Sequence, residues 1–212
     1  VVNELLIVKG RSLDKITQAE TIASYPGLSR DLGKLTASQY LGELLLYLSL
    51  SEQPQGEFYT LLNEHLQRLE NLPSDNDAQS LFALLAHLAH SIFHLLVVAG
   101  LGPRVQTCGI TNLPLIPNFS LNDWQVGFSI EAGGIINLAS GQQLLVNSKL
   151  DAEELLLLQQ LPTPRLSSQI INSSAWAKIE RVLRDYAQYH CGRAIRSAAL
   201  VDTLSAPLLS KY

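Results

Sequence analysis

The sequence predicts a mainly α-helical fold with a short β-hairpin at its start and an irregular module in its middle. Apolar residues recur at helical spacing over 30–99 and again over 151–189. The segment 104–150 between them is rich in glycine, proline and asparagine, and its apolar stretches are too short for helices. The first 22 residues are rich in Val, Ile and Leu and alternate loosely, which favours strands.

Two strands are expected at the beginning, over 1–8 and 13–22, joined by a turn at Lys9–Ser12. An isolated hairpin is marginally stable in water, so we expect these strands to pair with others. The chain has no methionine and opens within the apolar pattern. We therefore expect it to be a piece of a longer protein.

Three helices are expected next. Ser29 is a plausible N-cap for a first helix over 30–48, and a second helix is predicted over 57–72. The third, over 78–99, is apolar nearly all round and should lie at the centre of the fold. The glycines and proline of 100–103 end it.

The irregular segment 104–150 should contain short strands, and two further helices are predicted over 151–161 and 174–189. The breaker between these helices is Pro162-Thr163-Pro164. We expect the irregular module to be held by packing of its larger apolar side chains: Leu113, Leu115, Ile116, Phe119, Trp124, Phe128 and Ile130.

Composition sets limits on the class of protein. At 212 residues and 47% hydrophobic content, the chain can bury a full core, and its 16% of charged residues is below the roughly 25% of an average soluble protein. The net charge of −4 argues against nucleic-acid binding by the whole surface. The longest strongly apolar run, 92–101, is shorter than the about 20 residues of a membrane span, and no signal-peptide pattern is evident. We expect a cytoplasmic protein without membrane contact.

Two groups of residues could suggest a metal. His87, His90 and His94 share one side of the predicted central helix, but no carboxylate or thiolate adjoins them, so we interpret them as hydrogen-bonded helix histidines. Cys108 and Thr111 are spaced like half of a zinc knuckle that has lost its second cysteine. The sequence thus predicts no bound metal and no cofactor.

No pattern of catalytic residues stands out. The chain has no G-x-S-x-G, Walker A or G-x-G-x-x-G motif. His190 and Cys191 are neighbours, yet adjacent helical residues point apart. We expect a protein that is not an enzyme, with a cysteine-dependent hydrolase as a weaker alternative.

Basic residues gather late in the sequence. Lys178, Arg181 and Arg184 lie away from the apolar stripe of their predicted helix, and Arg193 and Arg196 follow its end. The ordinary interpretation is a solvated helix face. The functional one is an anion-binding surface for phosphates or for an acidic peptide tail.

Several motifs, in order, resemble those of the RecO family of bacterial DNA-repair and recombination mediators. Residues 10–20, GRSLDKITQAE, are similar to the segment that closes the N-terminal OB-fold of these proteins. The others are similar to the family's helices, glycine turn, cysteine module and C-terminal helix: Tyr25-Pro26-Gly27-Leu28, Asp31-Leu32, 40–44, 93–103, Cys108, 131–134, and 186–197 with Gly192-Arg193 and Ser197.

The resemblance implies four regions. Residues 1–24 would be the last strands of an OB-fold barrel, 25–105 a helical-bundle domain, 106–150 an irregular, degenerate zinc-finger-like module, and 151–212 C-terminal helices packed on the helical domain. The family's four zinc positions hold Cys108, Thr111, Asn137 and Ser140. With three cysteines missing, we expect the shape of the module without its zinc.

The resemblance also implies a function. RecO-like mediators of the RecF pathway bind single- and double-stranded DNA, anneal strands, work with RecR, and engage the acidic tail of single-stranded DNA-binding protein to help load recombinase. Our candidates for the tail or for DNA phosphates are His90, Arg104, Lys178, Arg181, Arg184, Arg193 and Arg196. The acidic net charge leaves open an alternative, a helical protein–protein interaction module without nucleic-acid binding.

Overall fold

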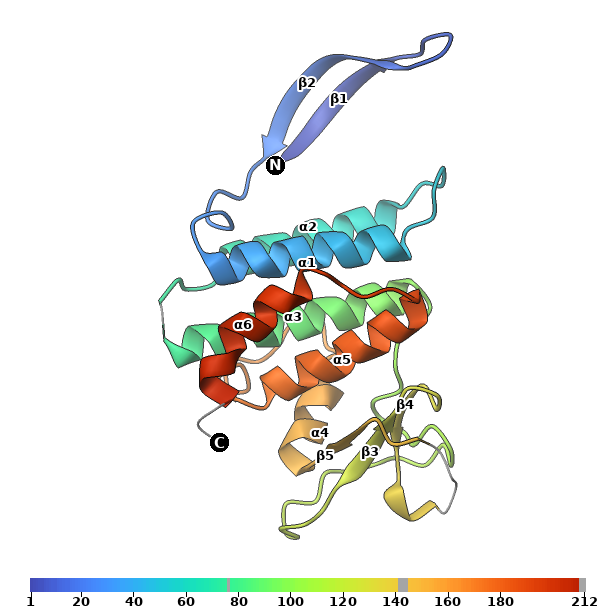
Figure 1. Ribbon diagram of the computed structural model, residues 1–212, viewed down its shortest axis with the longest axis vertical. Coiled ribbons are helices and arrows are strands. Elements are labelled where there is room, and N and C mark those ends of the chain that lie inside the picture. Colours follow the sequence, from blue (N-terminus) through green and yellow to red (C-terminus); the bar gives the residue numbers. More distant parts are fainter. Residues whose placement is uncertain (76, 141–144, 210–212) are drawn as a thin grey trace.

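The computed structural model describes residues 1–75, 77–140 and 145–209, apart from the side chains of residues 140 and 205–209. Figure 1 shows a hairpin, β1–β2, that stands away from a body of helices. The helices α1 and α2 lie nearest the hairpin, α3 and α5 cross the middle, and a small sheet lies at the opposite end. The predicted mainly helical fold is confirmed.

The hairpin consists of β1 (Val2–Val8) and β2 (Lys15–Ala23), paired antiparallel as the sequence predicts. Almost all of its side chains are exposed, including the apolar Leu6 and Ile16, which are 57% and 62% exposed. Among the described residues its sheet has two strands only. The hairpin therefore presents apolar surface that nothing in the described chain covers.

The first helix, α1 (Leu32–Leu48), begins two residues later than predicted. Its N-cap is Asp31, whose carboxylate accepts a hydrogen bond from the backbone N–H of Lys34 at 2.9 Å. The Ser29 hydroxyl donates instead to the carbonyl of Pro26. The choice of Ser29 was wrong because both residues are good caps and spacing alone does not separate them.

The next helices are α2 (Gly56–Glu70) and α3 (Ala78–Val98). By length and hydropathy, α3 could cross a membrane, but 67% of its most apolar window is buried inside the protein. Its N-cap, Asp77, accepts from the backbone of Ser80. The sequence prediction of a central helix is confirmed, since α3 packs against α1, α2 and α5.

The irregular module contains an antiparallel sheet in the order β4–β3–β5, with β3 (Val126–Ser129), β4 (Gly134–Ile136) and β5 (Ser148–Leu150), and a short 3-10 turn, η1 (Leu138–Ser140). The backbone of Arg104 extends this sheet beside Gly134, where a Cβ would lie 2.2 Å from the Arg104 carbonyl oxygen. Glycine is thus required at position 134 by both close approach and its positive φ of 148°.

The packing predicted for this module is half right. Phe128 and Ile130 are buried, and Leu115 and Trp124 are partly buried. The other three predicted residues are 63% to 76% exposed: Leu113, Ile116 and Phe119. They lie in the loop before β3, and the strands themselves supply the packing through Val126, Ile135, Ile136 and Leu150.

Three helices complete the fold: α4 (Ala152–Gln160), α5 (Trp176–Cys191) and α6 (Ala198–Leu209). Asp151 and Glu154 form a capping box at the start of α4. Gly192, in the left-handed conformation, ends α5. A separate helix over 198–209 was not predicted from the sequence, where Pro207 weakens the helical pattern.

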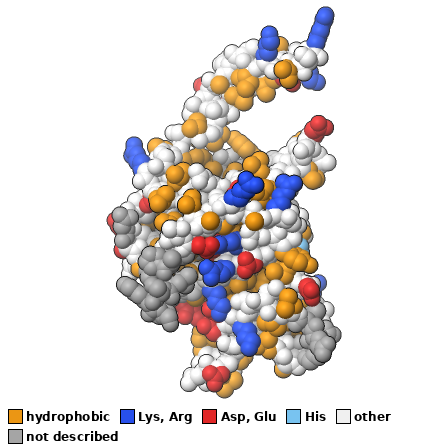
Figure 2. Space-filling view, viewed as in Figure 1, with side chains coloured by type: hydrophobic (Ala, Val, Ile, Leu, Met, Phe, Trp, Pro, Cys, Tyr) orange, Lys and Arg blue, Asp and Glu red, His pale blue; other side chains and the backbone are white. Residues whose placement is uncertain are grey.

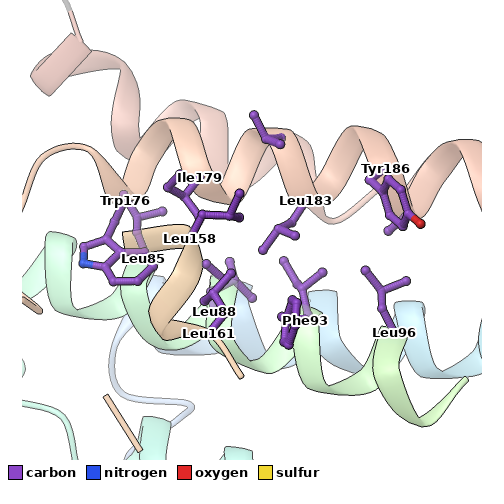
Figure 3. Packing of buried hydrophobic residues seen from close by; sticks show 14 of the residues in the cluster. Leu85, Leu88, Phe93, Leu96, Leu158, Leu161, Trp176, Ile179, Leu183 and Tyr186 are labelled. Carbon is purple, nitrogen blue, oxygen red and sulfur yellow. The ribbon is translucent and has the colours of Figure 1, made fainter. Parts of the chain in front are cut away.

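The core lies where α3, α4 and α5 meet. Figure 3 shows Leu85, Leu88, Phe93 and Leu96 of α3 facing Trp176, Ile179, Leu183 and Tyr186, with Leu158 and Leu161 beside them. Trp176 is fully buried, and its indole N–H donates to the carbonyl of Ile170 at 2.7 Å. This packing fixes one side of α5 against the core and turns its other side outward.

Candidate functional site

The outer side of α5 carries two of the predicted cations, and both are exposed and paired. The ammonium of Lys178 lies 2.7 Å from a carboxylate oxygen of Glu154, and the Arg181 guanidinium lies 3.4 Å from Asp202. The Arg181–Asp202 pair is exposed on both sides and contributes about 0–1 kcal/mol, whereas the Glu154 carboxylate that Lys178 contacts is buried. A phosphate or carboxylate ligand can therefore displace Asp202 from Arg181 at little cost.

Arg184 does not join the predicted exposed rim. Its side chain is 8% exposed and forms hydrogen bonds to buried Glu180 and to Asp202, the latter at 2.8 Å. Burial lowers the pKa of Arg184, but the hydrogen bond and negative charge of Glu180 outweigh it and raise the pKa overall. The buried hydroxyl of Tyr40, whose pKa is raised by burial and then by Glu180, lies in the same region. Arg184 belongs to a core ion pair.

Arg193 and Arg196 lie in the segment between α5 and α6, and this segment is tied to α1 by Glu43. The Glu43 carboxylate accepts hydrogen bonds from the backbone N–H groups of Arg196 and Ser197, both at 2.9 Å, and from the Ser197 hydroxyl at 2.6 Å. It also accepts from the Tyr47 hydroxyl, and the Arg193 guanidinium lies 5.6 Å from the Tyr47 ring centroid.

The same contacts set the protonation of Glu43. Burial raises the pKa of Glu43, but the hydrogen bonds from Ser197, Tyr47 and Arg196 have a larger, opposite effect and bring the pKa down to about 2. Glu43 is therefore ionised at neutral pH and holds the arginine-bearing segment in place. Glu43 and Ser197 belong to two separate sequence motifs, and their spacing along the chain does not predict that they meet.

Two other predicted residues lie elsewhere. Arg104 is exposed on the irregular module, where its guanidinium donates to the Asn112 side chain at 2.7 Å. His90 is fully buried in α3, with its Nε2 2.8 Å from the carbonyl oxygen of Thr163. Figure 2 shows the cations near α5 and α6 mixed with acidic side chains, so this face is not uniformly basic.

The structure also reveals a groove that the sequence analysis missed. It lies between α2, α3 and the loop after α4. Its lining combines apolar Leu72 and Leu166 with Arg165 and with the ion pair of Arg68 and Glu64. Arg165 is exposed and has no acidic partner among the described residues. Because it follows Pro164 in a loop without periodicity, no spacing pattern could have pointed to it.

The four predicted zinc positions lie in the irregular module, and three of them come together. The buried thiol of Cys108 accepts a hydrogen bond from the backbone N–H of Asn137 at 3.3 Å. Burial raises its pKa, but hydrogen bonds from Thr111 and Asn137 lower the value to about 7. Ser140 is the last residue of η1.

The His190–Cys191 pair lacks the electrostatics of an activated nucleophile. Burial raises the pKa of the Cys191 thiol and lowers the pKa of the His190 imidazole. Both shifts oppose formation of a thiolate–imidazolium pair at neutral pH. The rings of Tyr186 and Tyr189 lie against His190 instead.

Comparison with known proteins places these contacts in a family. The family model for the recombination protein O C-terminal domain matches residues 29–199, a span that contains Glu43, Ser197 and every cation of the predicted site. The chain belongs to the RecO family. Membership of this family assigns the chain a role in DNA repair, and the resemblance stated from the sequence motifs is confirmed.

Individual RecO proteins are similar over nearly the whole chain. The DNA repair protein RecO of Gloeothece citriformis is 52% identical over 97% of this chain and 79% of its own length. The RecO of Nostoc sp. strain PCC 7120 is 48% identical with the same coverage. The RecO of Synechocystis sp. strain PCC 6803 is 40% identical over 96% of this chain and 78% of its own length.

Proposed function

We propose that this RecO family member is a non-enzymatic mediator of the RecF pathway that binds and anneals DNA and helps load recombinase onto DNA coated with single-stranded DNA-binding protein. The observation that carries the proposal is the family match across 29–199. RecR and the tail of the single-stranded DNA-binding protein are the proposed protein partners. The four regions proposed from the sequence, 1–24, 25–105, 106–150 and 151–212, divide this work.

DNA phosphates are assigned to an α5 cationic surface, defined as Lys178, Arg181, Arg193 and Arg196. Arg193 and Arg196 have no carboxylate partner for their guanidinium groups among the described residues, so both can meet phosphates without losing an ion pair. Arg181 exchanges an exposed carboxylate partner for a phosphate, and the exposed ammonium of Lys178 can contact a phosphate while it stays beside buried Glu154. Such contacts bind any sequence and weaken with salt.

The hairpin is assigned to the closing edge of an OB-fold barrel. Its exposed apolar residues, such as Leu5 and Ile7, support this assignment because a barrel would bury one face of each strand. The module 106–150 is assigned to a degenerate zinc module. The convergence of Cys108, Thr111 and Asn137 supports that assignment, with hydrogen bonds in place of metal bonds.

The acidic, hydrophobic-ended tail is assigned to the groove between α2, α3 and the loop after α4. Such a tail needs an apolar floor and cations for its carboxylates. The groove offers Leu72 and Leu166 with Arg165, which has no acidic partner in the described part of the chain, and with Arg68, which is paired with Glu64 of the same lining. Another depression, beside the start of α3, is lined by Asp31, Asp75 and Asp77 and would repel an acidic peptide. Charge therefore favours the groove.

Fluorescence anisotropy with a labelled tail peptide tests this assignment. We expect binding that weakens with salt, and Arg165→Glu should weaken it by at least about 10-fold, which corresponds to about 1.4 kcal/mol. Lys149→Glu, which reverses an exposed cation on β5, is the matched control and should leave the affinity unchanged. Equal affinities of the Arg165→Glu variant and the wild-type chain would contradict the assignment.

A further inference from the structure

Three histidines meet inside the helical body. His65 of α2 lies beside His90 and His94 of α3, and one ring nitrogen from each lies within 4.8 Å of those of the other two. The ring centroids are 5.7 Å apart for His65 and His90, 5.4 Å for His65 and His94, and 4.0 Å for His90 and His94. The third member is His65, which the spacing of α3 alone could not reveal, whereas His87 stays outside the group.

The buried ring of His65 lacks the partners that an imidazole normally finds. It is 1% exposed, and neither of its nitrogens has a hydrogen-bond partner among the described residues. Leaving a buried donor or acceptor unpaired costs about 1–3 kcal/mol for each group. A bound ligand at this position would satisfy one nitrogen.

The other two rings are already oriented. The Nε2 of His90 lies 2.8 Å from the carbonyl oxygen of Thr163, and the Nε2 of His94 lies 2.9 Å from that of Leu161. A carbonyl can only accept, so each Nε2 must carry the proton and each Nδ1 keeps its lone pair. Imidazoles that ligate metals are fixed in this way, by a backbone carbonyl on the opposite nitrogen.

The three rings are also neutral at physiological pH. Burial and the neighbouring histidines lower the pKa of His65 to about 2 and that of His90 to about 3. Burial lowers the pKa of His94 as well. Neutral imidazoles have the free lone pairs that a metal needs, and binding then requires no loss of a proton.

We propose that His65, His90 and His94 form a site for one divalent transition-metal ion of the zinc type. Two imidazole nitrogens on a tetrahedral zinc lie about 3.3 Å apart for Zn–N distances of about 2.0–2.1 Å. The three nitrogens, which lie within 4.8 Å of one another, must therefore move closer together when the ion binds. Three histidines leave the fourth position for water. The ion would join α2 and α3 and, through the two carbonyls, the loop after α4.

Arg68 competes, through its guanidinium, with the metal ion for the Nδ1 lone pair of His90. Its guanidinium lies 3.4 Å from Nδ1 of His90 and pairs with the carboxylate of Glu64. It therefore places a positive charge at the lone pair that the metal would use, and it must turn outward when the ion binds. Removing this guanidinium should strengthen metal binding, while removing any of the three imidazoles should weaken it.

The test uses the chain without an affinity tag, stripped with a chelator and titrated with Zn²⁺ by calorimetry and with Co²⁺ by visible absorption. We expect one ion per chain, the absorption of a four-coordinate Co²⁺, and a rise in melting temperature on binding. His65→Leu should weaken binding by more than about 100-fold, and Arg68→Met should tighten it by about 10-fold.

Matched controls separate loss of the site from loss of folding. His65→Leu removes a buried ring whose nitrogens have no hydrogen-bond partner among the described residues, so the metal-free variant should melt no lower than the wild-type protein. His190→Asn, which changes an exposed histidine elsewhere, should bind as the wild type does. Binding of neither ion to the wild-type chain, or wild-type affinity in the His65→Leu variant, would overturn the proposal.

Discussion

At the scale of single residues, Glu43 connects the helical domain to the arginine-bearing segment. It receives four hydrogen bonds, three of them from residues about 150 positions later in the chain. Hydrogen bonds to a charged group contribute about 1.5–3 kcal/mol each at most, and the carboxylate is partly exposed, which reduces this. Glu43 therefore matters both for stability and for the placement of Arg193 and Arg196.

Glu43→Gln should lower the free energy of unfolding by about 1–3 kcal/mol at neutral pH, measured by urea titration. The folded pKa of about 2 lies below the ordinary value of 4.5, so this contribution is complete above about pH 4.5 and is lost as the pH falls towards 2. The stability of the Glu43→Gln variant should therefore lack the decrease that Glu43 causes between about pH 4.5 and pH 2. Glu20→Gln, an exposed acid on β2, should change little, and an equal loss in both variants would contradict this role.

The buried histidines make the folding stability depend on pH in a second range, which lies at higher pH than the range set by Glu43. Burial lowers the pKa of His65 to about 2, His90 to about 3 and His87 to about 4, from 6.5. Below pH 6.5 the unfolded chain binds protons that the folded chain does not, so stability falls as the pH falls. Each group contributes up to about 1.4 kcal/mol per pH unit in that range.

We expect urea titrations of the metal-free protein to show falling stability from about pH 6.5 to about pH 5, with a shallower slope in His65→Leu. The variant removes one group that the unfolded state protonates. A slope that is the same in both proteins would show that His65 is already protonated when folded. Above about pH 7 the wild-type protein should show no slope from these groups.

At the scale of elements, α5 is fixed by a buried ion pair as well as by apolar packing. Arg184 and Glu180 are 8% and 2% exposed and lie one turn apart. Removing one partner of such a pair leaves an uncompensated buried charge and costs about 3–5 kcal/mol. Replacing both by apolar groups removes that penalty.

Glu180→Leu should therefore destabilise the protein, by less than the about 3–5 kcal/mol of a pair without another partner, because Arg184 keeps its bond to Asp202. The double variant Glu180→Leu/Arg184→Met should recover most of the loss in urea titrations. The recovery distinguishes a charge penalty from a packing defect, since both variants change the same turn. If the double variant were less stable than the single one, the Arg184–Asp202 pair would outweigh the charge penalty, which would contradict this prediction.

Helices could be predicted from the sequence where the apolar pattern that defines them lies within one segment of the chain. The apolar stripe of α5 and the nearly apolar α3 gave correct helices because each pattern is complete within its own segment. The cap of α1 and the packing of the irregular module were mispredicted, since these depend on which side chain finds a partner in space. The sequence predicted that Arg184 points away from the core, but in the structure its side chain is buried and pairs with Glu180.

At the scale of the whole molecule, each proposed functional surface combines residues from segments that are far apart in the sequence. The α5 cationic surface gathers residues from α5 and from the turn before α6, whereas the groove brings α2 and α3 to the loop after α4. The histidine group joins residues 65, 90 and 94 from two helices. Family motifs predicted the order of these segments, and only the fold shows which of them meet.

The net charge of −4 gave an incomplete view for the same reason. Figure 2 shows acidic side chains beside several of the cations near α5 and α6, and Glu154 and Asp202 pair with such cations. Cations without a carboxylate partner can bind phosphates most readily, and Arg193 and Arg196 satisfy that condition among the described residues. An acidic protein can thus carry a local phosphate-binding surface.

The most direct test of the proposed mediator function is the salt dependence of single-stranded DNA binding, measured by anisotropy with a labelled oligonucleotide. We predict that the logarithm of the wild-type binding constant falls linearly with the logarithm of salt concentration. The slope should be smaller by about 1.4 in Arg193→Glu/Arg196→Glu, because each phosphate that an arginine neutralises adds about 0.7 to it. Lys149→Glu should keep the wild-type slope. Absence of salt-dependent binding at low ionic strength would contradict the account and favour a helical protein-interaction module without nucleic-acid binding.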